Sequence, residues 1–268
     1  MSHLPTVNFC GLEVTRLVIG ANPFGGFSHQ NPERDAAMKG YYSVERIVET
    51  WRRAEAAGVN TFITNNETEH VVEAARRYLG EGGSMQWIAQ VAYRKTPSME
   101  EAIDGVVRMG AKALYIHGGV VDDRFAHGDE ASIRRWCAHA RSAGVPAGVA
   151  GHAPEAHRWV NELDAVDFHA VCFFNCGSVH AGQGERFRLA DVAEAVSVIR
   201  SIAKPCIAYK IMGAGRLDAR MAFEHAFEHI KPGDIVNVGM HRGDRDDMVE
   251  ENVRMVGEVL GAQGGQGV

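Results

Sequence analysis

The sequence of 268 residues lacks a cysteine framework and an excess of basic side chains. Its five cysteines, at positions 10, 137, 172, 176 and 206, are odd in number and scattered. This pattern favours reduced thiols, and we expect a cytoplasmic protein. Lys and Arg together number 28 against 34 Asp and Glu, a formal net charge of -6, so the composition predicts no nucleic-acid partner. A small-molecule substrate is the expected partner.

Long apolar runs are also missing from the sequence. No run approaches the roughly 18 residues that indicate a membrane span, so we expect no membrane association. The amino terminus, Met1 to Pro5, lacks the basic and apolar regions of a secretory signal. Hydrophobic residues make up 46% and charged residues 23%, a composition that excludes disordered, collagen-like and coiled-coil proteins.

What the sequence does contain is an alternation of short apolar runs and longer amphipathic stretches, which predicts repeated βα units. The predicted strands are 16–20, 61–65, 86–91, 113–117, 147–151, 168–175, 206–211 and 235–240. The predicted helices are 43–57, 69–79, 98–109, 129–143, 154–163, 189–202, 218–230 and 246–260. Eight strands alternating with eight helices favour an α/β fold, a closed (β/α)8 TIM barrel, over an open sheet. We expect one domain over residues 1–260 and a flexible tail over 261–268.

Polar side chains gather where the predicted strands end, the place where barrels of this kind carry their chemistry. His117, His152, Lys210 and Glu67 are the predicted catalytic residues, because imidazoles, an amine and a carboxylate can move protons around a carbonyl. The predicted substrate-binding residues, all polar, are Asn22, Asn65, Gln90, Tyr93, Asn175, Arg216 and His241.

A divalent metal is a further expectation at this mouth. The predicted ligands are His117, His152, Glu67 and His241, with Asp122 as another carboxylate, because Zn, Mn, Fe and Co accept mixed nitrogen and oxygen ligands. The same side chains also suit acid-base chemistry without a metal. Two glycine- and arginine-bearing segments, 211–216 and 241–245, are consistent with a phosphate site or with plain glycine turns.

Several segments resemble aldo-keto reductases, which are (β/α)8 barrels that use NADPH. Residues 11–20, GLEVTRLVIG, with Phe24-Gly25-Gly26 after them, resemble the start of that family. The resemblance continues at the following segments: 58–62, 114–117, 148–155, 207–217 and 249–252. It implies an aldo-keto reductase-like barrel, with the Glu251-Asn252 pair matching the positions that contact adenine or remaining as helix surface.

The family's catalytic residues are mostly absent. Its Asp falls at Ile63 or Thr64, its Tyr near Thr68 and its Lys at Gln90 or Val91, whereas His117 matches the family's histidine. Two ionisable groups, His152 and Lys210, stand where the family commonly has a small polar residue or Asn and a Ser.

These departures favour a non-redox enzyme, an isomerase, epimerase or lyase acting on a sugar or keto-sugar by acid-base chemistry with or without a metal. An NADPH-dependent reductase with a rearranged proton donor is the alternative, and an inactive binding barrel is the third reading. With Lys210 facing the mouth, side-chain alternation along the strand predicts that Tyr209 points outward to the helices.

Overall fold

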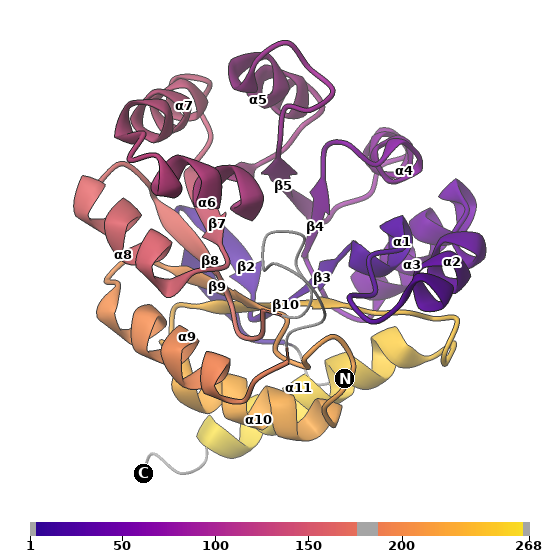
Figure 1. Cartoon of the computed structure of the whole chain (residues 1–268). Coiled ribbons are helices and arrows are strands. Elements are labelled where there is room, and N and C mark those ends of the chain that lie inside the picture. The colour runs from indigo at the N-terminus through magenta and orange to yellow at the C-terminus, as the bar shows by residue number, and fades with distance from the viewer. Residues whose placement is uncertain (1–3, 176–186, 265–268) are drawn as a thin grey trace.

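The computed structural model describes residues 4–175 and 187–264, and in it eight parallel strands close into a barrel in the order β10-β3-β4-β5-β6-β7-β8-β9 (Figure 1). The barrel strands are β3 (Leu17–Gly20), β4 (Thr61–Asn65), β5 (Gln86–Val91), β6 (Ala113–Ile116), β7 (Ala147–Gly151), β8 (Phe168–Cys172), β9 (Cys206–Tyr209) and β10 (Ile235–Gly239). The predicted (β/α)8 barrel is therefore confirmed. The largest difference is at β8, which ends at Cys172 rather than at Asn175.

Eight of the helices correspond to predicted ones and surround the barrel, as Figure 1 shows. They are α3 (Val44–Ala56), α4 (Glu69–Gly80), α5 (Met99–Arg108), α7 (Glu130–Ser142), α8 (Pro154–Leu163), α9 (Ala190–Ser201), α10 (Ala219–His229) and α11 (Met248–Gly264). Helix α11 continues four residues past the predicted boundary at 260, and residues 265–268 lie outside the described residues. No helix in the described ranges combines the length and the apolar character needed to cross a bilayer.

Three further helices and a hairpin were not predicted from the sequence. The helices are α1 (Asn22–Gly25), α2 (Pro32–Tyr41) and α6 (Gly118–Ala126), and the hairpin pairs β1 (Thr6–Phe9) with β2 (Leu12–Thr15). Phe9 is fully buried and meets Phe168 edge to face at a centroid distance of 5.1 Å. Because Phe168 begins β8, the hairpin closes the amino-terminal end of the barrel and leaves the opposite end uncovered by it.

Alternation of side chains along the strands divides the core into two layers. Residues such as Ile63, Ile88 and Ile207 fill the barrel interior, whereas their strand neighbours pack outward against the helices. Helix α3 shows the outer layer: Ser43 caps its first turn by accepting a hydrogen bond from the Arg46 amide. The alternation of side chains continues to the carboxyl ends of the strands, where it determines which side chains face the open end of the barrel.

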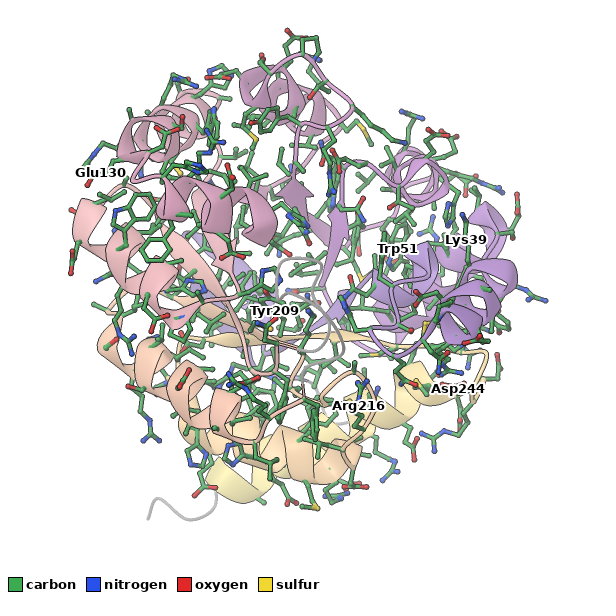
Figure 2. All side chains as sticks on the ribbon, viewed as in Figure 1. Lys39, Trp51, Glu130, Tyr209, Arg216 and Asp244 are labelled. Carbon is green, nitrogen blue, oxygen red and sulfur yellow. The ribbon has the colours of Figure 1, made fainter. Side chains whose placement is uncertain are left out.

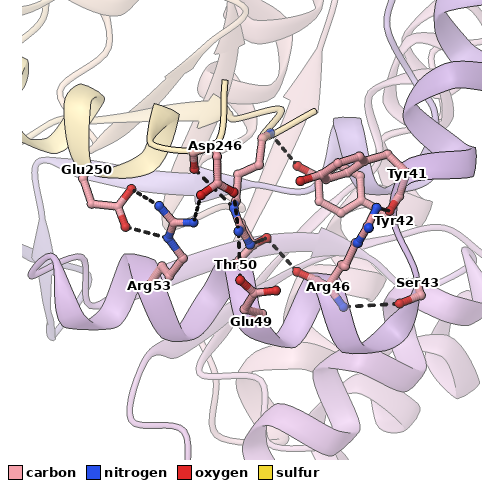
Figure 3. A network of polar contacts seen from close by, with 10 residues as sticks. Tyr41, Tyr42, Ser43, Arg46, Glu49, Thr50, Arg53, Asp246 and Glu250 are labelled. Carbon is pink, nitrogen blue, oxygen red and sulfur yellow. Dashed lines mark hydrogen bonds and ion pairs between the residues drawn. The ribbon is translucent and has the colours of Figure 1, made fainter. Parts of the chain in front are cut away.

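The loop after β10 is tied to α3 by a polar network that Figure 3 shows from close by. The Arg242 side chain is buried and donates hydrogen bonds to Glu49 (2.8 Å), Thr50 (3.2 Å) and Asp246 (2.6 Å). Its backbone amide donates to the Tyr42 hydroxyl at 2.9 Å. These bonds satisfy the buried guanidinium and fix the loop that forms one wall of the site.

Candidate active site

A cavity of about 320 Å³ lies at the carboxyl ends of the barrel strands. We name it the mouth cavity. Its polar side chains from the strand ends and the segments just after them include Asn22, Thr64, Asn65, Gln90, Tyr115, Tyr209, Lys210, Asn237 and His241. Figure 2 places Tyr209 over the centre of the barrel. Of the predicted site residues, Asn22, Asn65, Gln90, Lys210 and His241 are thus brought together.

Amide and hydroxyl groups make up the floor of the mouth cavity. The Tyr115 hydroxyl donates to the side-chain oxygen of Gln90 at 3.2 Å. The Asn65 side chain accepts from two backbone amides in the turn after β4, at 2.9 and 2.8 Å, which fixes its orientation. The Asn237 side-chain oxygen is buried, with no hydrogen-bond partner among the described residues. A floor of this kind suits a ligand that brings hydroxyl groups of its own.

Lys210 follows β9 in a left-handed backbone conformation, with φ of 56°. This conformation interrupts the alternation of the strand, so Lys210 and its neighbour Tyr209 both line the mouth cavity. The prediction that Tyr209 points outward is therefore wrong: Tyr209 packs against the barrel-interior residues. The Lys210 Nζ lies 5.9 Å from the centroid of the Tyr209 ring.

The hydroxyl group of Tyr209 is held by contacts with residues of β7 and β8. Its hydroxyl donates to the Gly151 carbonyl at 3.3 Å and lies against the Cys172 thiol. Burial raises the pKa of the Tyr209 hydroxyl well above its ordinary value, with a smaller contribution from the Cys172 thiol. Tyr209 is therefore a neutral hydrogen-bonding group at neutral pH.

His241 lines the mouth cavity from the loop after β10. Its ring is only 6% exposed and packs against Tyr41 and Tyr42, at centroid distances of 5.4 and 5.5 Å. Its Nδ1 is buried, with no partner among the described residues. Burial lowers the pKa of His241, opposed by the nearby Asp244 carboxylate. The imidazole is consequently neutral near pH 7 and able to accept a proton.

His152 forms a pair with Asp122, but the two residues line a different cavity. The His152 Nδ1 lies 2.7 Å from Asp122 Oδ2, and the His152 backbone amide donates to the other carboxylate oxygen at 3.1 Å. This second cavity, of about 550 Å³, borders α6, α8 and α9, and Asn175 also lines it. Neither His152 nor Asn175 lines the mouth cavity, which corrects the prediction that they join the other site residues there.

His117 and Glu67 also lie outside the mouth cavity. The His117 Nδ1 accepts a hydrogen bond from the Gly119 amide at 3.0 Å and caps the unpredicted helix α6. Glu67 pairs with Arg94 at 2.9 Å and accepts from its backbone amide at 2.7 Å. Both side chains thus make hydrogen bonds to nearby segments, and neither lines the mouth cavity.

Across residues 4–175 and 187–264 no three His, Cys, Asp or Glu side chains group closely enough to hold an ion, so the described residues do not bring three of the predicted metal ligands together. The strand-end rule placed these residues at one end of the barrel, but it did not fix their side-chain directions.

Tyr93 and Arg216 were predicted to bind substrate, but neither lines the mouth cavity. The Tyr93 ring packs beside Trp136 of α7, at a centroid distance of 5.9 Å. Arg216 donates to the carbonyls of Gly213 (2.7 Å) and His29 (3.0 Å), so it joins the loops after β9 and α1 (Figure 2). The loop after β9 lines the mouth cavity through other residues, such as Ala214.

Sequence reasoning missed several residues of the mouth cavity, among them Tyr115 and Asn237 of the barrel strands. A signal for both was present, because each has the same parity along its strand as an interior residue, Ala113 and Ile235. Alternation counted from the strand interior finds them, whereas counting only the last residue of each strand does not.

The fold and the site together define a (β/α)8 barrel with one polar mouth cavity at the end where such barrels bind ligands. No family model and no curated protein matches the sequence. Among solved structures, the chain resembles a proposed aldo-keto reductase from Pseudomonas aeruginosa, with a TM-score of 0.68, 17% identity and coverage of 96% of this chain and 95% of that one. The predicted aldo-keto reductase-like fold is confirmed.

Other barrels show the same architecture. Orotidine 5'-monophosphate decarboxylase from Methanocaldococcus jannaschii matches with a TM-score of 0.60, 11% identity and coverage of 92% of this chain and 99% of that one. 3-Hexulose-6-phosphate synthase from Salmonella typhimurium gives a TM-score of 0.60, 14% identity and coverage of 92% and 98%. At these identities the likeness shows the fold alone, and the activity must be argued from the site.

Proposed function

We propose that this protein is an enzyme that acts on a small, hydroxyl-rich carbonyl compound, such as a sugar or keto-sugar, by non-redox acid-base chemistry in the mouth cavity. The observation that carries this proposal is the position of Lys210, an amine that shares one cavity with the side chains of Asn65, Gln90 and Asn237. Such groups can pair with several substrate hydroxyls, and the amine supplies the positive charge that a carbonyl oxygen needs as it becomes an enolate.

The two ionisable groups best placed for this chemistry are Lys210 and His241. Lys210 holds the carbonyl oxygen and stabilises the negative charge that develops on it. His241, kept neutral by burial, takes the proton from the neighbouring carbon and returns it to another position. These roles replace those first expected of His117 and His152, which lie outside the mouth cavity.

Proton abstraction next to a carbonyl can be detected before the substrate is known. We would incubate the protein in D2O with a panel of aldoses, ketoses and hydroxy-ketones and follow the loss of the C–H signal next to the carbonyl by proton NMR. Exchange above the buffer rate is the expected result for at least one compound. No exchange across the panel, together with turnover of a carbonyl compound by NADPH, would contradict the proposal.

The role of Lys210 is tested with Lys210→Met and Lys210→Arg. We expect Met to abolish exchange and Arg to restore much of it, because an arginine keeps the positive charge but cannot form a Schiff base. Lys95→Met is a matched control, since Lys95 lies outside the cavity and pairs with Glu69 on the surface. If Lys210→Met and Lys95→Met exchange equally well, Lys210 is structural.

A nicotinamide-dependent reductase is the second candidate, favoured by the shape of the mouth cavity. The cavity extends past the loop after β9, along Gly215 and Leu217, to Met248 and Asn252 of α11. Asn252 is only 5% exposed and stands at a position that the resemblance links to adenine. The residues fit such a cofactor only in part, because Thr68, at the N-cap position of α4, stands near the position of the family's tyrosine, and Gln90 or Val91 stands at that of its lysine. Quenching of NADPH fluorescence on titration with the protein tests this candidate.

A further inference from the structure

Two histidines lie one turn apart at the carboxyl end of α10. His225 and His229 have the i,i+4 spacing that places both side chains on one face of a helix. Their rings lie nearly parallel, with centroids 4.1 Å apart and an interplanar angle of 29°. Two imidazoles that bind one ion at about 2 Å from each nitrogen have centroids about 4–5 Å apart, so the observed spacing matches that of a ligand pair whose side chains rotate to direct one nitrogen of each ring at the ion.

Hydrogen bonding determines which nitrogen of the His229 ring can bind a metal ion. The His229 Nδ1 lies 2.8 Å from the His225 carbonyl, which can only accept, so Nδ1 carries the hydrogen and Nε2 is the nitrogen with a lone pair.

The electrostatic surroundings of the pair are mixed, with negative groups closest to the rings. His229 is the last residue of α10, where the partial negative charge of a helix terminus favours a cation. The Glu228 carboxylate lies 3.9 Å from the His229 Nδ1. The Arg200 guanidinium opposes this attraction, but it faces the His229 carbonyl, to which it donates at 3.1 Å, and not the ring.

We propose that His225 and His229 form a binding site for one divalent late transition-metal ion, with Cu²⁺ bound most tightly. Imidazole nitrogen is a preferred ligand of these ions, and affinity for a given site generally rises toward Cu²⁺ along the first transition row. Within the described residues no third His, Cys, Asp or Glu joins the pair, so water completes the coordination and the ion exchanges readily. This site lies on an apolar groove between α9 and α10 and is separate from the mouth cavity.

The test is a Cu²⁺ titration of the metal-stripped full-length protein, followed by electron paramagnetic resonance and by competition with a weak chelator. All samples carry His3→Ala, because a free amino terminus followed closely by a histidine is itself a copper ligand. We expect one saturable site whose spectrum shows two coordinated imidazole nitrogens. We also expect the bound ion to raise the melting temperature, because it binds the folded helix but not the unfolded chain.

His225→Ala and His229→Ala separate this site from the other histidines. Each substitution should weaken Cu²⁺ binding by at least about tenfold and remove one nitrogen from the spectrum, because only one of the two imidazole ligands remains to hold the ion. His127→Ala, at an exposed histidine on another helix end, should leave binding unchanged. Circular dichroism confirms that each variant is folded. If binding is equally tight in all three variants, the copper is adventitious and the proposal is wrong.

Discussion

A buried pair of histidines makes the stability of the barrel depend on pH. His157 of α8 and His169 of β8 face each other with their Nδ1 atoms 3.2 Å apart, and both are almost inaccessible to solvent. The His157 Nε2 lies 3.3 Å from the Gly151 carbonyl, which can only accept, so Nε2 carries the hydrogen. The His157 Nδ1 therefore accepts from the His169 Nδ1, so this hydrogen bond requires His157 to be unprotonated.

Burial lowers the pKa of His157 to about 4 and that of His169 well below its ordinary value. The unfolded chain, with a histidine pKa near 6.5, binds more protons than the folded chain between these values, so stability falls as the pH falls through this window. For His157 alone, the loss between pH 7.5 and pH 5 amounts to about 2 kcal/mol. His169 shifts in the same direction and adds to this loss.

The assay is urea unfolding followed by circular dichroism at several pH values from 7.5 to 5, at constant ionic strength. In a thermal melt, a loss of about 2 kcal/mol would lower the melting temperature of a chain of this size by about 4–8 °C. His157→Gln keeps a donor toward Gly151 and an acceptor toward His169 but cannot titrate. We expect its stability to vary less with pH than that of the parent. The reasoning fails if the two proteins lose stability in parallel over this range.

Three further outcomes follow from the packing. Arg242→Met should lower the free energy of unfolding in urea by about 1–3 kcal/mol, because it removes the buried bonds between α3 and the loop after β10. Gly148→Ala should lower the free energy of unfolding by about 1–3 kcal/mol, because a Cβ there would lie 2.5 Å from the Phe168 ring. Gly105→Ala, in open space on α5, should raise it by about 0.5–1 kcal/mol. Equal effects of the two substitutions would refute this reasoning. Burial raises the pKa of Cys137 to about 12, so iodoacetamide at pH 8, monitored by mass spectrometry, should label it roughly a thousandfold more slowly in the folded than in the unfolded protein.

The strands and the main helices were predictable because their signals are local. Apolar runs and 3.6-residue periodicity depend only on neighbouring residues, and they located all eight barrel strands. Asn65 and Gln90, chosen because they lie at strand ends, line the mouth cavity, since side-chain alternation gives them the same direction as the interior residues Ile63 and Ile88. Elements with short or irregular patterns, such as α6 and the β1-β2 hairpin, were missed, because four to nine residues carry too little periodicity.

The positions of side chains beyond the strand ends were decided by tertiary structure. His117 follows β6 directly, yet its ring caps a helix instead of facing a ligand. Glu67 lies two residues past β4 and turns to Arg94. His152 turns to Asp122 of α6, a partner 30 residues away. His117 took a partner two residues away, whereas Glu67 and His152 took partners from segments that only the closed barrel brings beside them.

The sequence alone therefore predicted the barrel, the carboxyl ends of its strands as the place of the site, and the polar side chains at those ends. The tertiary structure decided which polar groups share one cavity. Lys210 illustrates the physical reason: its left-handed backbone interrupts the strand alternation, so two successive side chains, Tyr209 and Lys210, both line the mouth cavity. Local patterns report where a strand ends, but the direction of the next side chain depends on the backbone dihedrals and on partners that folding brings from distant parts of the chain.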